Sequence, residues 1–132
     1  MKSGTKDLKL AVIGLGYVGL PLALEFQKKR VVVGFDIDEK RIKDLNSGID
    51  KNLETTSQEL KNLRRLKFTN NENDLKSSNC FIITVPTPIN EFKKPDLGPL
   101  FQASKIVGNI IKKGDLIIYE STVYPGCIED KC

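Results

Sequence analysis

Continuous apolar runs alternate with segments of helical periodicity along most of this chain. The apolar runs cover residues 8–14, 31–36, 80–85 and 115–121, and a brief strand is expected at 67–70. Segments with helical character lie between them, at residues 17–29, 38–48, 55–66 and 98–114. Strands that are apolar throughout are typical of parallel sheets with helices on both faces. Because crossovers are right-handed, the pattern predicts an α/β fold with a doubly wound parallel sheet of the Rossmann type, ordered 3-2-1-4-5 in three layers, α/β/α.

Local signals indicate where several of these helices begin and end. Pro21 fits the first turns of the first helix, where a missing N–H costs little. Gly48 is expected to stop the second helix, and Gly114 to end the fourth. Thr or Ser residues followed by Glu59 resemble a capping box at the start of the third.

A glycine-rich turn joins the first strand to the first helix. It consists of Gly14, Leu15, Gly16, Tyr17, Val18 and Gly19. Gly14 permits a tight turn, Gly16 lets a pyrophosphate approach the backbone, and Gly19 allows close packing of the helix on the sheet. The start of the helix offers N–H groups and partial positive charge to phosphates. This spacing also occurs in ordinary tight turns, but its position between a strand and a helix favours dinucleotide binding.

An acidic residue, Asp36, ends the second apolar run. A carboxylate at this position can accept hydrogen bonds from both ribose hydroxyls of adenosine, and it repels the 2′-phosphate of NADP. The pattern therefore favours NAD. Arg41 could partly offset that repulsion. Two alternatives remain: Asp36 could cap the next helix instead, and S-adenosylmethionine binds to the same fold.

Composition excludes several classes of function. The chain has 132 residues, 39% of them hydrophobic and 29% charged, as expected for one globular domain. It has no histidine, which excludes histidine acid–base chemistry and histidine metal ligation within the chain, and we expect no metal site. The net charge is +4, but lysine and arginine are spread along the sequence, so nucleic-acid binding is not favoured.

The cysteines and the apolar segments suggest a cellular compartment. Cys80, Cys127 and Cys132 form no Cys-x-x-Cys pair, and Cys80 opens an apolar run in which we expect it to be buried. Residues 1–10 lack the apolar core of a signal peptide, and no apolar run is long enough to span a membrane. These features favour a reducing, cytoplasmic environment without membrane association.

Five short motifs occur in order along the chain. They are IGLGYVGLPLA (13–23), GFDID followed by Arg41 (34–41), IITVPTP (82–88), PDL (95–97) and ESTVYPG (120–126). Together they resemble the N-terminal NAD-binding domain of the UDP-glucose/GDP-mannose dehydrogenase family, over about residues 8–132. The stretches ITVPTPIN, PDLGPL and YESTVYPGC are typical of its UDP-N-acetylglucosamine and UDP-N-acetylgalactosamine 6-dehydrogenases of O-antigen and capsule polysaccharide synthesis.

The resemblance implies an oxidoreductase and a set of contacts with NAD. Family members oxidise the C6 hydroxymethyl group of a nucleotide sugar to a carboxylate with two NAD, through a cysteine-bound intermediate. The matching cofactor contacts are the glycine turn, Asp36, Arg41, Thr87 and Thr122. Arg41 would lie near the adenosine, and Thr122 near the reacting centre in a supporting catalytic role. Thr87 could instead be a turn residue between prolines, and Thr122 a helix or turn cap.

The resemblance also implies that essential parts lie elsewhere. Family members are much longer, and their catalytic cysteine, lysine and asparagine, with most sugar-binding residues, fall beyond Cys132. None of the three cysteines here matches the catalytic one. We therefore interpret residues 1–132 as a truncated NAD-binding domain that is inactive alone, from a UDP-sugar dehydrogenase that forms a homodimer or higher oligomer.

Two other interpretations stay open. The chain could be a stand-alone nucleotide-binding or regulatory module without catalysis. It could also belong to another Rossmann enzyme, such as a hydroxyacid dehydrogenase or a methyltransferase, although VPTP and ESTVYPG argue against both.

Overall fold

Five strands and several helices make up the described part of the chain. The computed structural model describes residues 8–50, 60, 63–85 and 97–120. The strands are β1 (Leu10–Ile13), β2 (Val32–Phe35), β3 (Leu66–Thr69), β4 (Cys80–Ile83) and β5 (Leu116–Tyr119). The helices are α1 (Gly19–Phe26), α2 (Glu39–Asn46), the 3₁₀ helix η1 (Glu72–Leu75) and α4 (Gly98–Ile110).

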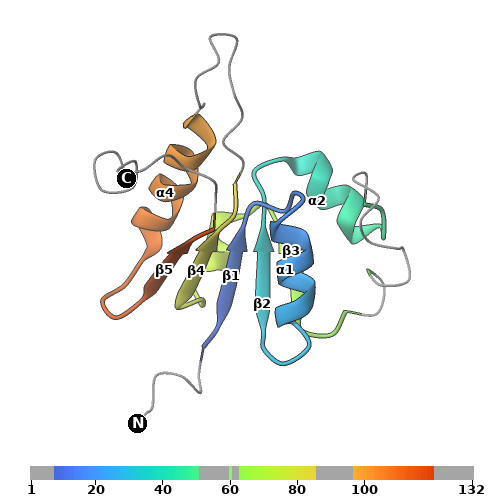
Figure 1. Cartoon of the computed structure of the whole chain (residues 1–132), viewed down its shortest axis with the longest axis horizontal. Helices are drawn as coiled ribbons and strands as arrows, with labels where there is room; N and C mark the ends of the chain where they lie inside the picture. The colour runs from blue at the N-terminus through green and yellow to red at the C-terminus, as the bar shows by residue number, and fades with distance from the viewer. Residues whose placement is uncertain (1–7, 51–59, 61–62, 86–96, 121–132) are drawn as a thin grey trace.

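The strands form one parallel sheet in the order β3-β2-β1-β4-β5 (Figure 1). In the register of the central strands, Leu10 of β1 lies between Val32 of β2 and Cys80 of β4. The strand order confirms the predicted doubly wound topology. The order reverses between β1 and β4, and this position is where such sheets bind ligands.

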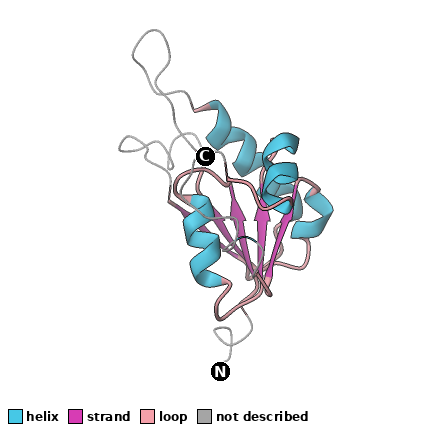
Figure 2. Ribbon diagram, turned by 90° about the vertical axis from the view of Figure 1, so that its right-hand side faces the viewer, coloured by secondary structure: helices cyan, strands magenta, loops and turns pink. Residues whose placement is uncertain are grey.

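Helices cover both faces of the sheet and bury a separate core on each (Figures 1 and 2). On one face, Leu20 and Ala23 of α1 and Leu45 of α2 pack against Val12 and neighbouring strand residues. The opposite core is built by η1, α4 and the strands, with these fully buried members: Phe35, Leu75, Phe81, Ile83, Leu100 and Val107. Each such side chain contributes roughly 1.5–3 kcal/mol through burial. The two cores confirm the three-layer α/β/α architecture.

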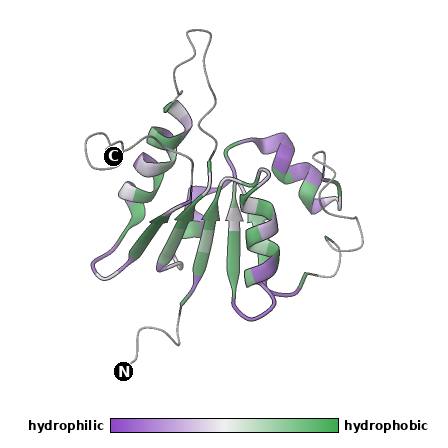
Figure 3. Ribbon diagram, in the orientation of Figure 1, coloured by the Kyte–Doolittle hydropathy of each residue, from purple (hydrophilic) through white to green (hydrophobic). Residues whose placement is uncertain are grey.

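The hydropathy of the elements matches this arrangement (Figure 3). The strands are predominantly hydrophobic, whereas α2 carries many hydrophilic residues and buries only Ile42 and Leu45. Within the described ranges, no helix combines the length and the apolar character needed to cross a lipid bilayer.

The ends of α1 and α2 follow the local sequence signals. Pro21 lies in the first turn of α1, as predicted. The carboxylate of Asp38 accepts hydrogen bonds from the N–H groups of Lys40 and Arg41 and so caps α2. Gly48, with φ +82°, follows the end of α2 in a conformation that favours glycine, which confirms the predicted stop.

The ends of α4 and of the segment before β3 differ from the prediction. α4 stops at Ile110, and Gly114 lies in the turn before β5, because the Asp115 carboxylate binds the Lys112 N–H. Leu66, predicted as the end of a helix, instead opens β3 and pairs with Val32. Most of the predicted helix at 55–66 lies outside the described residues.

The 3₁₀ helix η1, which the sequence did not predict, is tied to β3 by a polar cluster. The hydroxyl of Thr69 donates to Asp74 Oδ2 at 2.5 Å and accepts the Asn71 N–H at 3.0 Å. Lys67 Nζ lies 3.3 Å from Asp74 Oδ1. The hydrogen bond from Thr69 does most to lower the pKa of Asp74; Lys67 lowers it further, and desolvation opposes both.

A group whose pKa is lowered by folding stabilises the protein at neutral pH and loses this effect as pH falls through its folded pKa. We therefore expect Asp74→Asn to lower the free energy of unfolding by about 1 kcal/mol at pH 7, and by less at pH 3. Urea unfolding at both pH values measures this, with the exposed Glu72→Gln as control. An equal loss at both pH values would show that the Asp74 charge is unimportant.

Candidate functional site

A cleft of about 340 Å³ opens where β1, β2 and β4 end. It lies at the point where the strand order reverses, as expected for a ligand site in a doubly wound sheet. The β1–α1 turn, the residues after β2, Val85 after β4 and one side of α4 form its walls. The lining residues are Ile13, Gly14, Leu15, Gly16, Phe35, Asp36, Ile37, Asp38, Arg41, Val85, Pro99, Gln102, Ala103 and Ile106.

Gly14 turns the chain sharply out of β1. Its φ is +101°, which side-chain-bearing residues rarely adopt. A Cβ at this position would also lie 3.0 Å from both the Cγ1 and the backbone N of Val85. The Gly14 N–H donates to the carbonyl of Phe35 at 2.8 Å, so the turn begins in register with the end of β2.

Gly19 lets α1 approach the sheet closely. A Cβ there would overlap the carbonyl oxygen of Gly14 and the hydroxyl of Thr84. The buried Thr84 hydroxyl fills this contact, donating to the carbonyl of Gly14 at 2.6 Å and lying 3.1 Å from that of Ile13. The turn, the helix and the end of β4 therefore meet without space for another side-chain atom.

Gly16 lies on the open side of the turn. A Cβ at Gly16 would meet no atom within 4 Å, so the space beside it is available to a ligand. Val18, at the N-cap of α1, provides no side-chain hydrogen bond, and the first turn of α1 holds no acid. Tyr17 and Val18 are exposed. The Leu20 N–H donates to the Gly16 carbonyl and Pro21 has no N–H, so the N–H groups that could meet a phosphate beside Gly16 are those of the turn itself.

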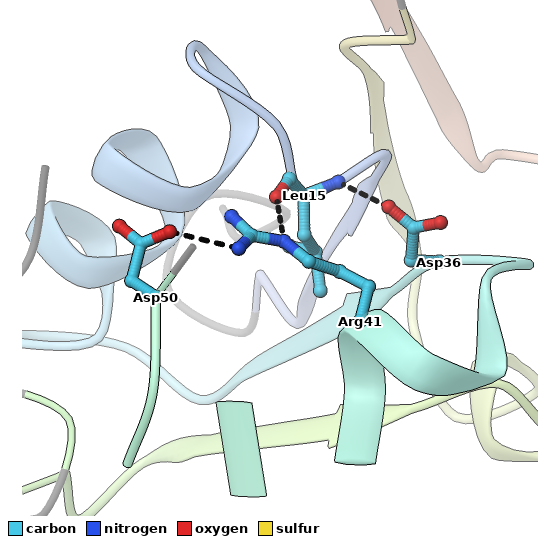
Figure 4. A network of polar contacts seen from close by, with 4 residues as sticks. All are labelled: Leu15, Asp36, Arg41 and Asp50. Carbon is cyan, nitrogen blue, oxygen red and sulfur yellow. Dashed lines mark hydrogen bonds and ion pairs between the residues drawn. The ribbon is translucent and has the colours of Figure 1, made fainter. Parts of the chain in front are cut away.

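Asp36 lies at the end of β2 with its carboxylate against the glycine turn (Figure 4). Asp36 Oδ2 accepts the N–H of Leu15 at 2.9 Å, and Oδ1 accepts the N–H of Asp38 at 2.9 Å. Each carboxylate oxygen can still accept a second hydrogen bond, as ribose recognition requires. Asp38, rather than Asp36, caps α2, so the capping alternative for Asp36 does not describe its position.

Arg41 reaches from α2 to the same turn (Figure 4). Its Nε donates to the carbonyl of Leu15 at 2.8 Å, and its Nη1 lies 2.8 Å from Asp50 Oδ1. The side chains of Arg41 and Asp50 are 10% and 0% exposed, so this ion pair is buried. Sequence reasoning singled out Arg41 but missed Asp50, since nothing in the sequence around Asp50 marks it as a partner of the turn.

The fourth wall comes from α4, which the sequence analysis did not connect with the site. Pro99, Gln102, Ala103 and Ile106 line the cleft. Their spacing of three to four residues places them on one side of the helix. That periodicity could have identified a shared face, although not the cleft it would line.

The remaining sequence-predicted residues are distributed differently. Thr87 and Thr122 lie outside the described residues, as do Cys127 and Cys132. Cys80 is buried, as predicted. It is the first residue of β4, whereas the cleft lies beyond the last residue of that strand. Burial raises the pKa of its thiol, which disfavours the reactive thiolate.

Comparisons with known proteins agree with this geometry. The profile described as "UDP-glucose/GDP-mannose dehydrogenase family, NAD binding domain" matches residues 8–132. The UDP-N-acetyl-D-glucosamine 6-dehydrogenase of Salmonella typhi is 58% identical over 129 residues, which cover 98% of this chain and 30% of that protein. The enzyme of the same name from Pseudomonas aeruginosa is 61% identical over 127 residues, covering 96% of this chain and 30% of that protein.

A solved structure is similar in fold. The UDP-D-ManNAc dehydrogenase from Pyrococcus horikoshii superposes with a TM-score of 0.86 at 42% identity, over 92% of this chain and 30% of that one. The chain thus spans about 30% of the length of the curated relatives that it matches.

Gly16 and Gly19 are expected to respond differently to substitution. Gly16→Val should weaken NAD binding about a hundredfold or more, because the side chain fills the phosphate space and charged hydrogen bonds are lost, while stability changes by less than about 1 kcal/mol. Gly19→Ala should lower stability by about 3 kcal/mol, because α1 must move off the sheet.

Isothermal titration calorimetry with NAD and thermal unfolding measure the two effects separately. Gly108→Ala, on the exposed side of α4 with open space around it, is the matched control and should change neither property by much. Normal NAD binding by a folded Gly16→Val protein would contradict the placement of the phosphate.

Proposed function

Because this chain belongs to the UDP-glucose/GDP-mannose dehydrogenase family, we propose that it is the NAD-binding part of a nucleotide-sugar 6-dehydrogenase. The proposed reaction oxidises the C6 hydroxymethyl group of a UDP-N-acetylhexosamine, or of UDP-glucose, to a carboxylate with two NAD. The observation that carries the choice of substrate is the identity of about 60% with two UDP-N-acetyl-D-glucosamine 6-dehydrogenases over nearly the whole chain.

NAD is the cofactor of this domain, and the cleft suits it. The open space beside Gly16 and the uncapped start of α1 match a pyrophosphate, and the carboxylate of Asp36 matches a ribose diol. Apolar residues that line the cleft, among them Ile37 and Val85, offer surface to an aromatic base. These contacts support the assignment of the glycine turn and Asp36 to the cofactor.

When bound, NAD would supply the hydride acceptor that oxidation of an alcohol requires. Conversion of an alcohol to a carboxylate would use two equivalents of this oxidant, with water supplying the second oxygen. The described residues contribute to this reaction by holding and orienting the cofactor. In this proposal Thr87 contacts NAD, Thr122 supports the reacting centre, and the nucleophile and most of the sugar site come from outside residues 1–132.

The wider setting follows from the same proposal. In this proposal the product would serve O-antigen or capsule polysaccharide synthesis. Protein CapL of Staphylococcus aureus is 50% identical over 123 residues. We place the enzyme in the cytoplasm, where NAD is available, and propose a homodimer or higher oligomer for the parent protein. UDP-sugar is the expected partner of the assembled enzyme.

Substitution of Asp36 tests the adenosine end of the site. Asp36→Asn keeps an oxygen that can accept the Leu15 N–H, but it removes the charge, so NAD binding should weaken roughly tenfold or more. Titration with 2′-deoxyadenosine NAD completes the test: removal of the hydroxyl should weaken binding to the wild type and add little in the variant. The exposed Glu39→Gln is the charge-matched control. If removal of the 2′-hydroxyl weakened binding to Asp36→Asn as much as binding to the wild type, the ribose would lie elsewhere.

A chimera tests the enzymatic role. In it, this chain replaces the matching segment of the Pseudomonas aeruginosa UDP-N-acetyl-D-glucosamine 6-dehydrogenase. We expect the chimera to form two NADH per molecule of uronate and Gly16→Val to abolish the reaction, while residues 1–132 alone bind NAD without turnover. NADH absorbance and product chromatography measure this. A folded chimera that binds NAD but is inactive would favour the stand-alone module; turnover by the chain alone would contradict the missing catalytic part.

A further inference from the structure

The peptide units around Leu15 are held by two charged side chains of opposite sign (Figure 4). The Leu15 N–H donates to Asp36 Oδ2 at 2.9 Å, and the Leu15 carbonyl accepts from Arg41 Nε at 2.8 Å. The Leu15 side chain is fully buried beneath them. The part of the turn that precedes the phosphate space therefore has little freedom to move.

Asp50 determines the direction of the Arg41 side chain. Arg41 and Asp36 both line the cleft, yet the guanidinium extends away from Asp36 toward Asp50 (Figure 4). The Asp50 carboxylate is completely buried, and Oδ1 lies 2.8 Å from Arg41 Nη1. Within the described part of the chain, Arg41 Nη2 is buried and has no hydrogen-bond partner. The positive charge of Arg41 is thus balanced by Asp50.

We propose that Asp50 sets the preference of this domain for NAD over NADP by holding Arg41 against the β1–α1 turn. Asp50 is then a positioning residue that acts through Arg41 and does not contact the cofactor. This inference rests on the proposed placement of the adenosine ribose at Asp36.

A 2′-phosphate bound beside Asp36 would meet charged side chains of the cleft. Beside the Asp36 carboxylate it would be repelled, unless a cation were available to balance it. A guanidinium binds phosphate well through two parallel hydrogen bonds, and Arg41 is the arginine that lines the cleft. While Arg41 is bound to Asp50 and to the Leu15 carbonyl, its guanidinium does not neutralise the 2′-phosphate. NADP is therefore rejected.

Removal of Asp50 should release Arg41 and so reduce the rejection of NADP. A buried guanidinium that loses its carboxylate is strongly unfavourable and tends to reach solvent or another anion. The 2′-phosphate of NADP, bound in the cleft that Arg41 lines, would provide that anion. At the same time the Leu15 carbonyl would lose a firmly held donor, which should weaken NAD.

The test measures the dissociation constants of NAD and NADP for the 132-residue chain by isothermal titration calorimetry. Asp50→Asn should reduce the ratio of the NADP constant to the NAD constant roughly tenfold or more. Asp50→Glu retains the charge and should keep the ratio near that of the wild type. Glu39→Gln removes one exposed negative charge from α2 outside the cleft lining and should also leave it unchanged.

The double variant Arg41→Met with Asp50→Leu identifies the responsible cation. Replacing a buried ion pair by apolar residues of similar size is often tolerated. This variant should weaken NAD and NADP by similar factors, so the ratio stays within about threefold of the wild type. A tenfold shift toward NADP in the double variant, or an equal shift in Glu39→Gln, would overturn the role of Arg41.

A folded Asp50→Asn protein with an unchanged ratio would overturn the proposal, since a purely structural residue would affect both cofactors alike. If Asp50→Asn does not fold in buffer alone, all variants are compared in trimethylamine N-oxide, which favours the folded state: a tenfold reduction of the ratio in Asp50→Asn that is absent from the double variant supports the proposal, and an unchanged ratio in Asp50→Asn contradicts it. NAD binding by Asp36→Asn tests the placement of the ribose independently. An error in that placement can therefore be distinguished from an error in the role of Asp50.

Discussion

The contact between the β1–α1 turn and the end of β4 determines the geometry of the whole site. Gly14, Gly19 and Thr84 meet there so closely that a Cβ on Gly19 would overlap two neighbouring oxygens. The Thr84 hydroxyl satisfies the Gly14 carbonyl, which otherwise would be buried unpaired at a cost of about 1–3 kcal/mol. Because α1 is held this close, the turn that leads into it is fixed in place, and Gly16 borders the open space of the cleft.

Charged residues then fix the part of the turn that packing leaves undetermined. Asp36 and Arg41 bind the N–H and the carbonyl of Leu15, so one residue of the turn is held from β2 and from α2. The buried Asp50 completes this network. A buried ion pair rarely adds much net stability, and its value here lies in the conformation it specifies. The same groups that shape the turn also set the charge along this side of the cleft.

The sequence predicted those features that arise from local periodicity and from short motifs. Strand order, the glycine turn and the position of Asp36 follow from such patterns, and the structure agrees with them. The sequence left open whether Asp36 caps α2, and the structure shows Asp38 in that position. Leu66 was assigned to a helix because its pairing with Val32 is a long-range contact that periodicity does not register. Asp50 and the α4 wall were missed for the same reason: their roles depend on the three-dimensional meeting of distant segments.

The hydrogen bond from Thr84 to Gly14 joins residues 70 positions apart in the chain. Closing such a large loop costs conformational entropy, which the pairing of β4 with β1 must offset. The turn therefore acquires its binding shape only when β4 has docked at the centre of the sheet. NAD binding is therefore coupled to completion of the fold. Bound NAD would favour molecules in which β4 is already paired with β1.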